Sequence, residues 1–480
     1  MIKLELSVDQ VNKVMDIYGK SYYSYRDMPE KKSLYAALKE KIESVINTTT
    51  EFSDRIVGKF LRNNFVDGSN NISENMIQEY LKKKEIGQVI VDFWCCVADV
   101  WIAELGNDGS VRDDFKDCMN GVTAVQIGEK LSKWDGVRKY VMNWRENGAE
   151  REECLDLVRA IITANTFPLF HIPNEGRFRF DMNSPEASLN DKFEKQMENQ
   201  KPFDIMKFRY HIDVFGKREG NIRGALDKLG EIFDYDYLLL GIPRHEVLTT
   251  IFVPVCPYCN RQYITKYGQI GHEKTTADLD HFYHKSLYPF LALSVYNFVP
   301  SCSICNSIFK GTVDFYAMPH LYPYTQQSNS EMKFQLNDIN LLWEIKRWKN
   351  DGVEEKLAVK INPGENVDGD RVKAVVNNKR VFHLEEIYQS HTAQVYELMC
   401  RALVYSNKRI RDLYKVFSVE GEENSSKLFF DEMEIYNMVF GQYLDEGEMH
   451  NRPLAKMTHD LLEDLWPEIE RIKWKRGWQG

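Results

Sequence analysis

Long apolar runs are missing from this 480-residue sequence. The best candidate for a membrane span, Gly87 to Leu105, is interrupted by Asp92, Asp99 and Glu104, and each acidic side chain is costly in hydrocarbon. We therefore predict a buried core helix here and no membrane association. The opening residues MIKLELSVDQ also lack a basic stretch followed by an apolar one, so no secretory signal is expected.

An excess of positive charge is missing as well. The chain has 62 Lys and Arg against 72 Asp and Glu, which gives a formal net charge of −10. No global positive field therefore attracts nucleic acid, and any binding of phosphates must depend on local charge and a metal ion.

Cysteine is scarce, with nine in the whole chain, and four of these fall into two C-x-x-C pairs. The other five are expected to be buried packing residues: Cys95, Cys96, Cys118, Cys154 and Cys400. A long chain with few cysteines and no export signal indicates reduced thiols, so we expect a cytoplasmic protein.

The chain is too long for a single hydrophobic core, and two or three domains are expected. The predicted fold class is α+β and mainly helical. Residues 1–245 are predicted to form a helical N-terminal region, either a partner or sensor module or a plain helical support. Residues 246–330 carry the candidate chemistry, and residues 331–480 are predicted to be mainly helical again.

Capping residues and hydrophobic spacing predict the helices. Ser7-Val8-Asp9-Gln10 has the form of a capping box, and the apolar residues that follow at helical spacing end at Gly19. Further helices are predicted near residues 30–47, 74–84, 87–105, 123–146 and 149–166, with two or three more between 384 and 470.

Three segments predict extended structure. Around residues 168–185, prolines and the alternation Arg177-Phe178-Arg179-Phe180 indicate a loop or a short hairpin. Residues 247–255 are apolar and β-branched, which predicts a strand leading into Cys256. Residues 356–361 alternate between polar and apolar side chains and predict another strand.

Two C-x-x-C pairs predict a zinc site. Cys256 and Cys259 are separated by 42 residues from Cys302 and Cys305. Each C-x-x-C turn directs two thiolates at one point, and two such turns close a tetrahedral four-cysteine site with no open position. A closed site indicates structural zinc. Four buried thiols or a redox pair are the alternatives, and the presence of two separate pairs favours zinc.

Candidate catalytic residues lie between and just after these pairs. The stretch Ala277-Asp278-Leu279-Asp280-His281-Phe282-Tyr283-His284 is followed by Asn297, and the second pair leads directly into Asn306. This order resembles the zinc-supported HNH (ββα-metal) endonucleases. The resemblance covers roughly residues 256–324 and implies two strands and a helix, with Asp280 and His281 on a strand and Asn306 on the helix.

The resemblance also implies a role for each residue. His281 would be the general base that takes a proton from water, and Asp280 and Asn306 would bind a catalytic Mg²⁺ or Mn²⁺. Asn297 would orient the loop and the base. Lys310 could contact a phosphate, and a solvated lysine at a helix end is the alternative.

His284 departs from the family pattern, which usually has proline at this position. A second imidazole could assist the metal or the phosphate, while a partly exposed loop histidine without a catalytic role is the alternative reading.

Two weaker matches extend the resemblance beyond the zinc segment. Leu321-Tyr322-Pro323-Tyr324 and the stretch from Asn451 to Asp460 resemble elements of larger bacterial HNH proteins found in anti-phage loci, such as Septu-like systems. These matches imply a defence role and a possible ATPase or other defence subunit as partner.

The resulting reading is an HNH endonuclease that cuts DNA. A zinc-knuckle module that binds nucleic acid without cutting it is the rival from another class, and an HNH nuclease acting on RNA is a third reading. The presence of Asp280, His281, Asn297 and Asn306 together favours an enzyme over a binding module.

Overall fold

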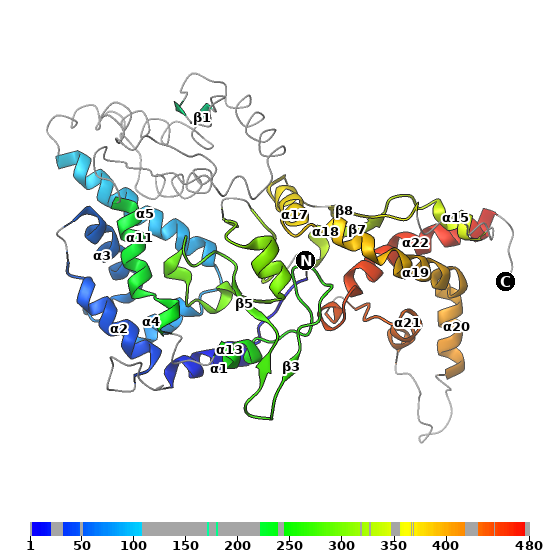
Figure 1. Ribbon diagram of the computed structural model, residues 1–480, viewed down its shortest axis with the longest axis horizontal. Helices are drawn as coiled ribbons and strands as arrows, with labels where there is room; N and C mark the ends of the chain where they lie inside the picture. The colour runs from blue at the N-terminus through cyan, green and yellow to red at the C-terminus, as the bar shows by residue number, and fades with distance from the viewer. Residues whose placement is uncertain are drawn as a thin grey trace.

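A computed structural model shows a mainly helical α+β chain, as predicted, whose strands pair in small antiparallel sheets (Figure 1). The structure describes residues 2–20, 32–48, 51–107, 170–171, 179–180, 221–238, 244–316, 319–325, 328–346, 356–365, 367, 369–417, 431–445 and 447–475. The helices predicted at 123–146 and 149–166 lie outside these residues.

The first helix begins where the sequence predicts it. In α1 (Val8–Gly19) the Ser7 hydroxyl accepts a hydrogen bond from the backbone N–H of Gln10, and the Gln10 side chain accepts one from the N–H of Ser7. This confirms the capping box, which satisfies two backbone donors at the helix start. The helix buries the face that contains Val11, Val14 and Tyr18.

Seven further helices precede the zinc segment in the described part of the chain: α2 (Leu34–Val45), α3 (Phe52–Phe65), α4 (Glu74–Leu81), α5 (Ile86–Asn107), α11 (Asn221–Ile232), α12 (Tyr235–Leu238) and α13 (Arg244–Thr250). Helix α5 buries Ile90, Phe93 and Trp94, which confirms the predicted core helix. No described helix is long and apolar enough to cross a lipid bilayer. Helix α3 was not predicted.

Short antiparallel pairs account for the strands: β1 (Phe170–His171) with β2 (Arg179–Phe180), β3 (Lys266–Tyr267) with β4 (Lys274–Thr275), β5 (Asp278–His281) with β6 (Phe298–Ser301), and β7 (Met332–Leu336) with β8 (Val359–Pro363). The first pair lies in the predicted hairpin region, and β8 overlaps the strand predicted at 356–361. The 3₁₀ turns η1 (Pro289–Leu291) and η2 (Val295–Asn297) connect β5 to β6, and the π-helix η3 (Ile304–Lys310) follows β6.

The strand predicted at residues 247–255 is wrong. Its first four residues belong to α13, and Val255 makes only an isolated bridge with Tyr263. Helix α13 packs against α1 and buries Val247 and Leu248, so the burial of this face outweighs the β preference of its branched side chains.

The C-terminal part holds more helices than the two or three predicted: α14 (Ser328–Glu331), α15 (Leu341–Lys346), α17 (Gly369–Val381), α18 (Leu384–Tyr388), η4 (Gln389–His391), α19 (Thr392–Val404), α20 (Asn407–Phe417), α21 (Glu432–Phe440), η5 (Met449–Asn451) and α22 (Ala455–Lys475). Helix α22 lies against β7, where the buried Asp460 carboxylate accepts the N–H of Phe334 at 3.0 Å.

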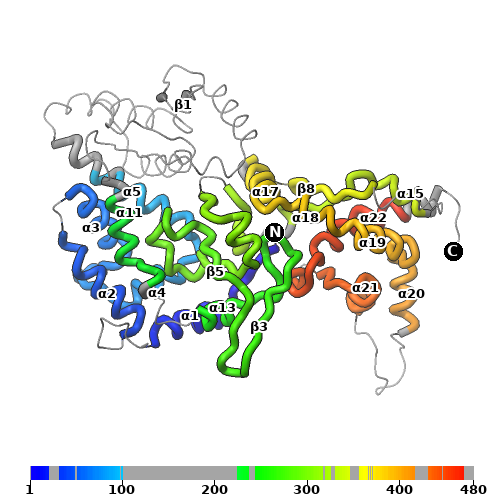
Figure 2. The backbone as a smooth tube through the Cα atoms, viewed as in Figure 1, coloured from blue at the N-terminus to red at the C-terminus, as the bar shows by residue number. Residues whose placement is uncertain are grey.

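One continuous apolar core joins the N-terminal helices, the segment with the cysteine pairs and the C-terminal helices. Figure 2 shows that segment, in green, between the N-terminal helices in blue and the C-terminal helices in yellow to red. The Tyr18 hydroxyl donates to the Leu293 carbonyl, and the Tyr80 hydroxyl donates to the Phe290 carbonyl. The N–H of Ile2 also binds the carbonyl of Pro257 at 2.8 Å. The core crosses residues 245 and 330, and the division into domains at these positions stays a prediction.

Candidate metal centre and adjoining strand

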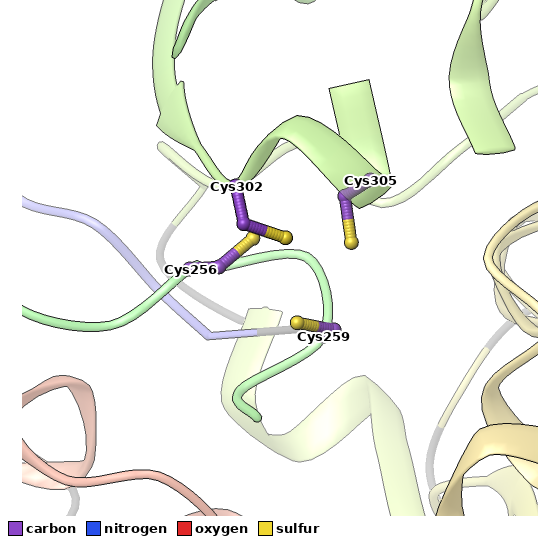
Figure 3. A group of neighbouring side chains, drawn as sticks. All are labelled: Cys256, Cys259, Cys302 and Cys305. Atoms are coloured by element: carbon purple, nitrogen blue, oxygen red, sulfur yellow. The ribbon is translucent and has the colours of Figure 1, made fainter. Parts of the chain in front are cut away.

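Four cysteines meet in the interior, as the sequence predicts. Their sulfur atoms all lie within 4.8 Å of one another, and every one of these residues is buried: Cys256, Cys259, Cys302 and Cys305. Figure 3 shows the sulfur atoms turned toward a common centre, two from a loop, one from the junction after β6 (Cys302) and one from the start of η3 (Cys305). Tetrahedral zinc with Zn–S bonds of about 2.3 Å needs sulfur atoms roughly 3.8 Å apart. The cluster can therefore bind a metal ion of the zinc type.

The first cysteine turn is held by the C-terminal part of the chain. Asn260, directly after Cys259, has a positive φ of 47°, and its carbonyl accepts the N–H of Leu454 at 2.7 Å. Its side-chain oxygen accepts the N–H of Lys456 at 3.1 Å. The Tyr388 hydroxyl donates to the carbonyl of Cys259. The stretch 451–460, noted in the sequence for its resemblance, thus holds the metal turn in place.

The second cysteine turn continues into an unusual helix. The N–H of Asn306 binds the carbonyl of Cys302, and the N–H of Gly311 binds the carbonyl of Asn306, a five-residue step. Such π-helical steps are rare and frequently occur at functional sites. Gly311 ends the helix with a φ of 49°, a conformation that L side chains rarely adopt.

Protons are unevenly distributed over the four thiols. Hydrogen bonds from Cys256, Cys259 and Cys305 lower the pKa of Cys302 well below the usual value for a thiol. Burial raises the pKa of Cys256, and hydrogen bonds with the neighbouring thiols raise the pKa of Cys305, so the negative charge is favoured at Cys302. The thiolate is the form that binds metal.

Asp280 connects the four-cysteine cluster to the strand and the helix. One of its carboxylate oxygens accepts the ammonium group of Lys310 at 2.6 Å, and the other accepts the hydroxyl of Tyr258 at 2.5 Å. Tyr258 lies inside the first C-x-x-C turn, and its ring stacks on Phe382. Only 4% of Asp280 is exposed. A shift of the cysteine turn would therefore also displace this carboxylate.

Lys310 lies in the interior rather than at the surface. Its side chain is fully buried, and its ammonium also binds the carbonyl of His281 and lies 4.9 Å from the centre of the Phe315 ring. Burial lowers the pKa of Lys310, and the carboxylate of Asp280 opposes this shift. In this arrangement the ammonium neutralises Asp280 and is not open to a phosphate.

Asn306 contacts Asp278, a carboxylate for which the sequence predicts no role. Its side-chain amide donates to Asp278 at 3.2 Å, and Arg244 contacts the other oxygen of Asp278 at 3.3 Å. Asp278 and Asp280 lie on the same face of β5, because side chains alternate along a strand. The alternation Asp-x-Asp could have indicated this second acidic group. The amide oxygen of Asn306 accepts no hydrogen bond from the described part of the chain.

His281 lies on the opposite side of β5 from these two aspartates. Its Nε2 is 2.9 Å from the carbonyl oxygen of Ala292, and its ring packs edge-on against Tyr235 and Phe298. Burial lowers the pKa of His281 to about 3, and the Ala292 carbonyl opposes the shift. The imidazole is thus neutral at pH 7. Because a carbonyl only accepts, Nε2 carries the proton and Nδ1 keeps the lone pair.

Asn297 fixes the backbone on both sides of the β5–β6 connection. Its side-chain oxygen accepts the N–H of Tyr283 at 2.7 Å, and its amide donates to the carbonyls of Tyr283 and Leu291 at 3.0 Å. Asn297 is fully buried. These bonds fit the positioning role inferred from the resemblance.

His284 lies at the partly exposed end of this connection. Its Nδ1 is 2.7 Å from the Ser286 hydroxyl and also accepts the N–H of Ser286. Burial and then Lys310 lower the pKa of His284 to about 4, while Asp280 and Asp314 oppose the shift. His284 is therefore neutral at pH 7 and within the electrostatic reach of the Asp280–Lys310 pair.

The buried Asp280–Lys310 pair leads to a stability prediction. Replacing Lys310 with Met leaves Asp280 buried beside a single neutral donor, and we expect a loss of roughly 3–5 kcal/mol in the free energy of unfolding. The double variant Asp280→Asn/Lys310→Met keeps an acceptor for Tyr258 and should recover most of that loss. Urea denaturation of the three proteins measures both quantities. A single variant as stable as the parent would show that the pair is not formed.

Comparison of the chain with protein-family models, with curated proteins and with solved structures finds no match.

Proposed function

We propose that the protein is a metal-dependent endonuclease of the HNH type that hydrolyses phosphodiester bonds in DNA. The observation that carries the proposal is the bond between Tyr258 and Asp280. This bond connects the four-cysteine cluster to β5, which ends in Asp280 and His281. The helix η3, after the second cysteine turn, supplies Asn306, whose amide donates to Asp278 on the same face of β5 as Asp280. These are the residue types that such hydrolysis requires.

Asp280 and Asn306 are the proposed ligands of a catalytic Mg²⁺ or Mn²⁺. An ionised carboxylate offers about four lone-pair positions, so the bonds from Tyr258 and Lys310 leave room for a cation at Asp280. The amide oxygen of Asn306 is a second hard donor of the kind these ions prefer. A bound cation would stabilise negative charge on the phosphate and on the leaving oxygen.

His281 is the proposed general base. Its neutral imidazole, with the proton on Nε2, can take a proton from water at Nδ1. A pKa of about 3 makes a weak base on its own. Because His281 and Asp280 lie on opposite sides of β5, the phosphodiester would have to lie across the end of this strand to meet both the base and the metal ligands. Its anion beside the ring would then stabilise the imidazolium and raise the pKa toward the range in which proton transfer is efficient. Asn297 would hold the connection that carries the Ala292 acceptor.

A binding module that never cuts remains the competing proposal, together with a nuclease that acts on RNA. A role in bacterial anti-phage defence, with an ATPase or another defence subunit as partner, rests on the resemblance of residues 321–324 and 451–460. These readings differ in what the purified protein does to nucleic acids.

The decisive experiment is incubation of the purified protein with plasmid, single-stranded DNA and RNA, each with Mg²⁺, with Mn²⁺ or with EDTA. Cleavage of DNA that requires a divalent ion is expected. Binding without cleavage under every condition, including addition of the products of neighbouring genes, would favour the binding module. Cleavage confined to RNA would overturn the choice of substrate.

A further inference from the structure

A hairpin between the first cysteine turn and β5 is exposed on both faces. All ten residues from Thr265 to Lys274 are exposed, and Figure 1 shows the β3–β4 hairpin extending away from the rest of the described chain. Its base is fixed, because the N–H of Thr276 binds the carbonyl of Thr265 at 3.0 Å and Thr265 binds back to the Thr276 hydroxyl. The hairpin is thus a defined projection, contacted near its base by Phe252, whose ring centre lies 4.6 Å from the Lys266 ammonium.

The tip of the hairpin presents an apolar side chain to solvent. Gly268 and Gly271 have positive φ values of 107° and 86°, and the N–H of His272 binds the carbonyl of Gln269. Between the glycines, Ile270 is 97% exposed. A single exposed isoleucine is common on protein surfaces, and a partner that covers this one would gain by burying it.

Basic side chains flank this tip in an otherwise acidic protein. Lys266 and Lys274 lie four residues on either side of Ile270, and neither forms an ion pair within the described part of the chain. His245 lies beside β4, where its Nδ1 accepts the N–H of Thr275 at 3.4 Å. Burial lowers the pKa of His245, and the positive charges of Arg244 and Lys274 lower it further, so both cations lie near this ring. Positive charge thus runs from the hairpin toward Asp278, which Arg244 contacts.

We propose that the hairpin 265–274 enters the major groove of double-stranded DNA, with Ile270 against the base edges and Lys266 and Lys274 on phosphates. The major groove of B-DNA is about 12 Å wide and admits a two-stranded ribbon, while the major groove of A-form RNA is too narrow to be read. The proposal rests on the nuclease function and names its substrate class as duplex DNA.

The dimensions of the hairpin fit this placement. The groove is about 8.5 Å deep, and a strand advances roughly 3.3 Å per residue. With Ile270 at the floor, four residues of strand span at most about 13 Å, so the two lysine backbones stand just above the groove rim and their long side chains reach back to the phosphates. The hairpin then leads through residues 275–277 directly into β5, so the proposed catalytic strand lies at the base of the element that holds the duplex.

Binding measured in EDTA tests the hairpin separately from cleavage. Fluorescence anisotropy with the full chain would compare duplex DNA, single-stranded DNA and double-stranded RNA of one sequence. We expect a preference for duplex DNA. Lys266→Ala/Lys274→Ala should weaken duplex binding about 30-fold at 0.15 M salt and reduce the slope of log K against log salt by about 1.8, because two phosphate contacts are lost. Ile270→Ser should weaken binding with the slope unchanged.

The matched control removes two exposed lysines elsewhere, Lys360 in β8 and Lys408 in α20. Lys360→Ala/Lys408→Ala should leave both the affinity and the salt slope as in the parent. If the parent cuts DNA and the hairpin variants bind duplex DNA as tightly as the parent does, the hairpin proposal is overturned and the nuclease proposal stands. If duplex DNA binds through the hairpin but is never cut, the hairpin proposal stands and the nuclease proposal is overturned. If double-stranded RNA binds as tightly as duplex DNA, the proposed substrate class is overturned.

Discussion

Replacement of His281 with Ala is expected to lower the rate of DNA cleavage by about two to four orders of magnitude, the usual contribution of a general base. The neutral ring is fixed by its bond to the Ala292 carbonyl and by the faces of Tyr235 and Phe298, and Nδ1 is its one lone-pair nitrogen. Without it, the described residues that contact the ring, Tyr235, Phe298 and the Ala292 carbonyl, offer no nitrogen base to take the proton from water. Single-turnover cleavage of labelled duplex DNA measures the loss.

The control must separate lost chemistry from lost structure, because His281 is only 7% exposed and its removal leaves the Ala292 carbonyl without this donor. DNA binding in EDTA, zinc content and thermal unfolding are therefore measured on the same preparations. His284→Ala is the matched histidine variant, and it should retain most activity. If His281→Ala binds DNA and cuts it at the parental rate, the assignment of the general base fails.

Loss of a metal-binding cysteine should have a still larger effect, on folding rather than on one chemical step. Structural zinc contributes about 10–16 kcal/mol in small zinc modules, which equals or exceeds the 5–15 kcal/mol by which a typical protein is stable. Cys302→Ser is therefore expected to give insoluble or unfolded protein without zinc. The Tyr258–Asp280 bond would carry the disruption into β5.

Expression yield, circular dichroism and metal analysis of the purified protein measure this outcome. Cys400→Ser is the matched control, since Cys400 lies partly exposed on α19, away from the cluster, and the variant should keep the fold and one zinc per chain. A soluble Cys302→Ser protein that is folded and active without zinc would contradict a structural metal at this site.

The meeting of the four cysteines was the most predictable part of the molecule from the sequence. A C-x-x-C turn fixes the direction of both thiols locally, so pairing two such turns needs no knowledge of the rest of the fold. The capping box at Ser7 was predictable for the same reason, because all the groups that form it lie within four residues.

Features that depend on distant parts of the chain were not predictable. Lys310 is buried because Asp280, thirty residues earlier, neutralises it, and nothing near Lys310 in the sequence signals this partner. The segment 247–255 failed for a related reason: its β-branched residues favour a strand, while packing of α13 on α1 makes their first half helical. His281 and Asp280 point to opposite sides of β5, and predicting which side each one faces also requires the register of β5 against β6.

The backbone bonds at the start of the chain have a consequence for folding during synthesis. The N–H of Ile2 binds the carbonyl of Pro257, and the N–H of Leu4 binds the carbonyl of Pro323. A ribosome adding roughly 5–20 residues per second needs about 15–60 s to travel from Leu4 to Pro323. For that time both apolar side chains, buried in the finished protein, lack their partners. The packing of residues 2–4 is therefore completed only after the segment with the cysteine pairs has been made, and we expect chaperones that bind emerging chains to engage this apolar stretch.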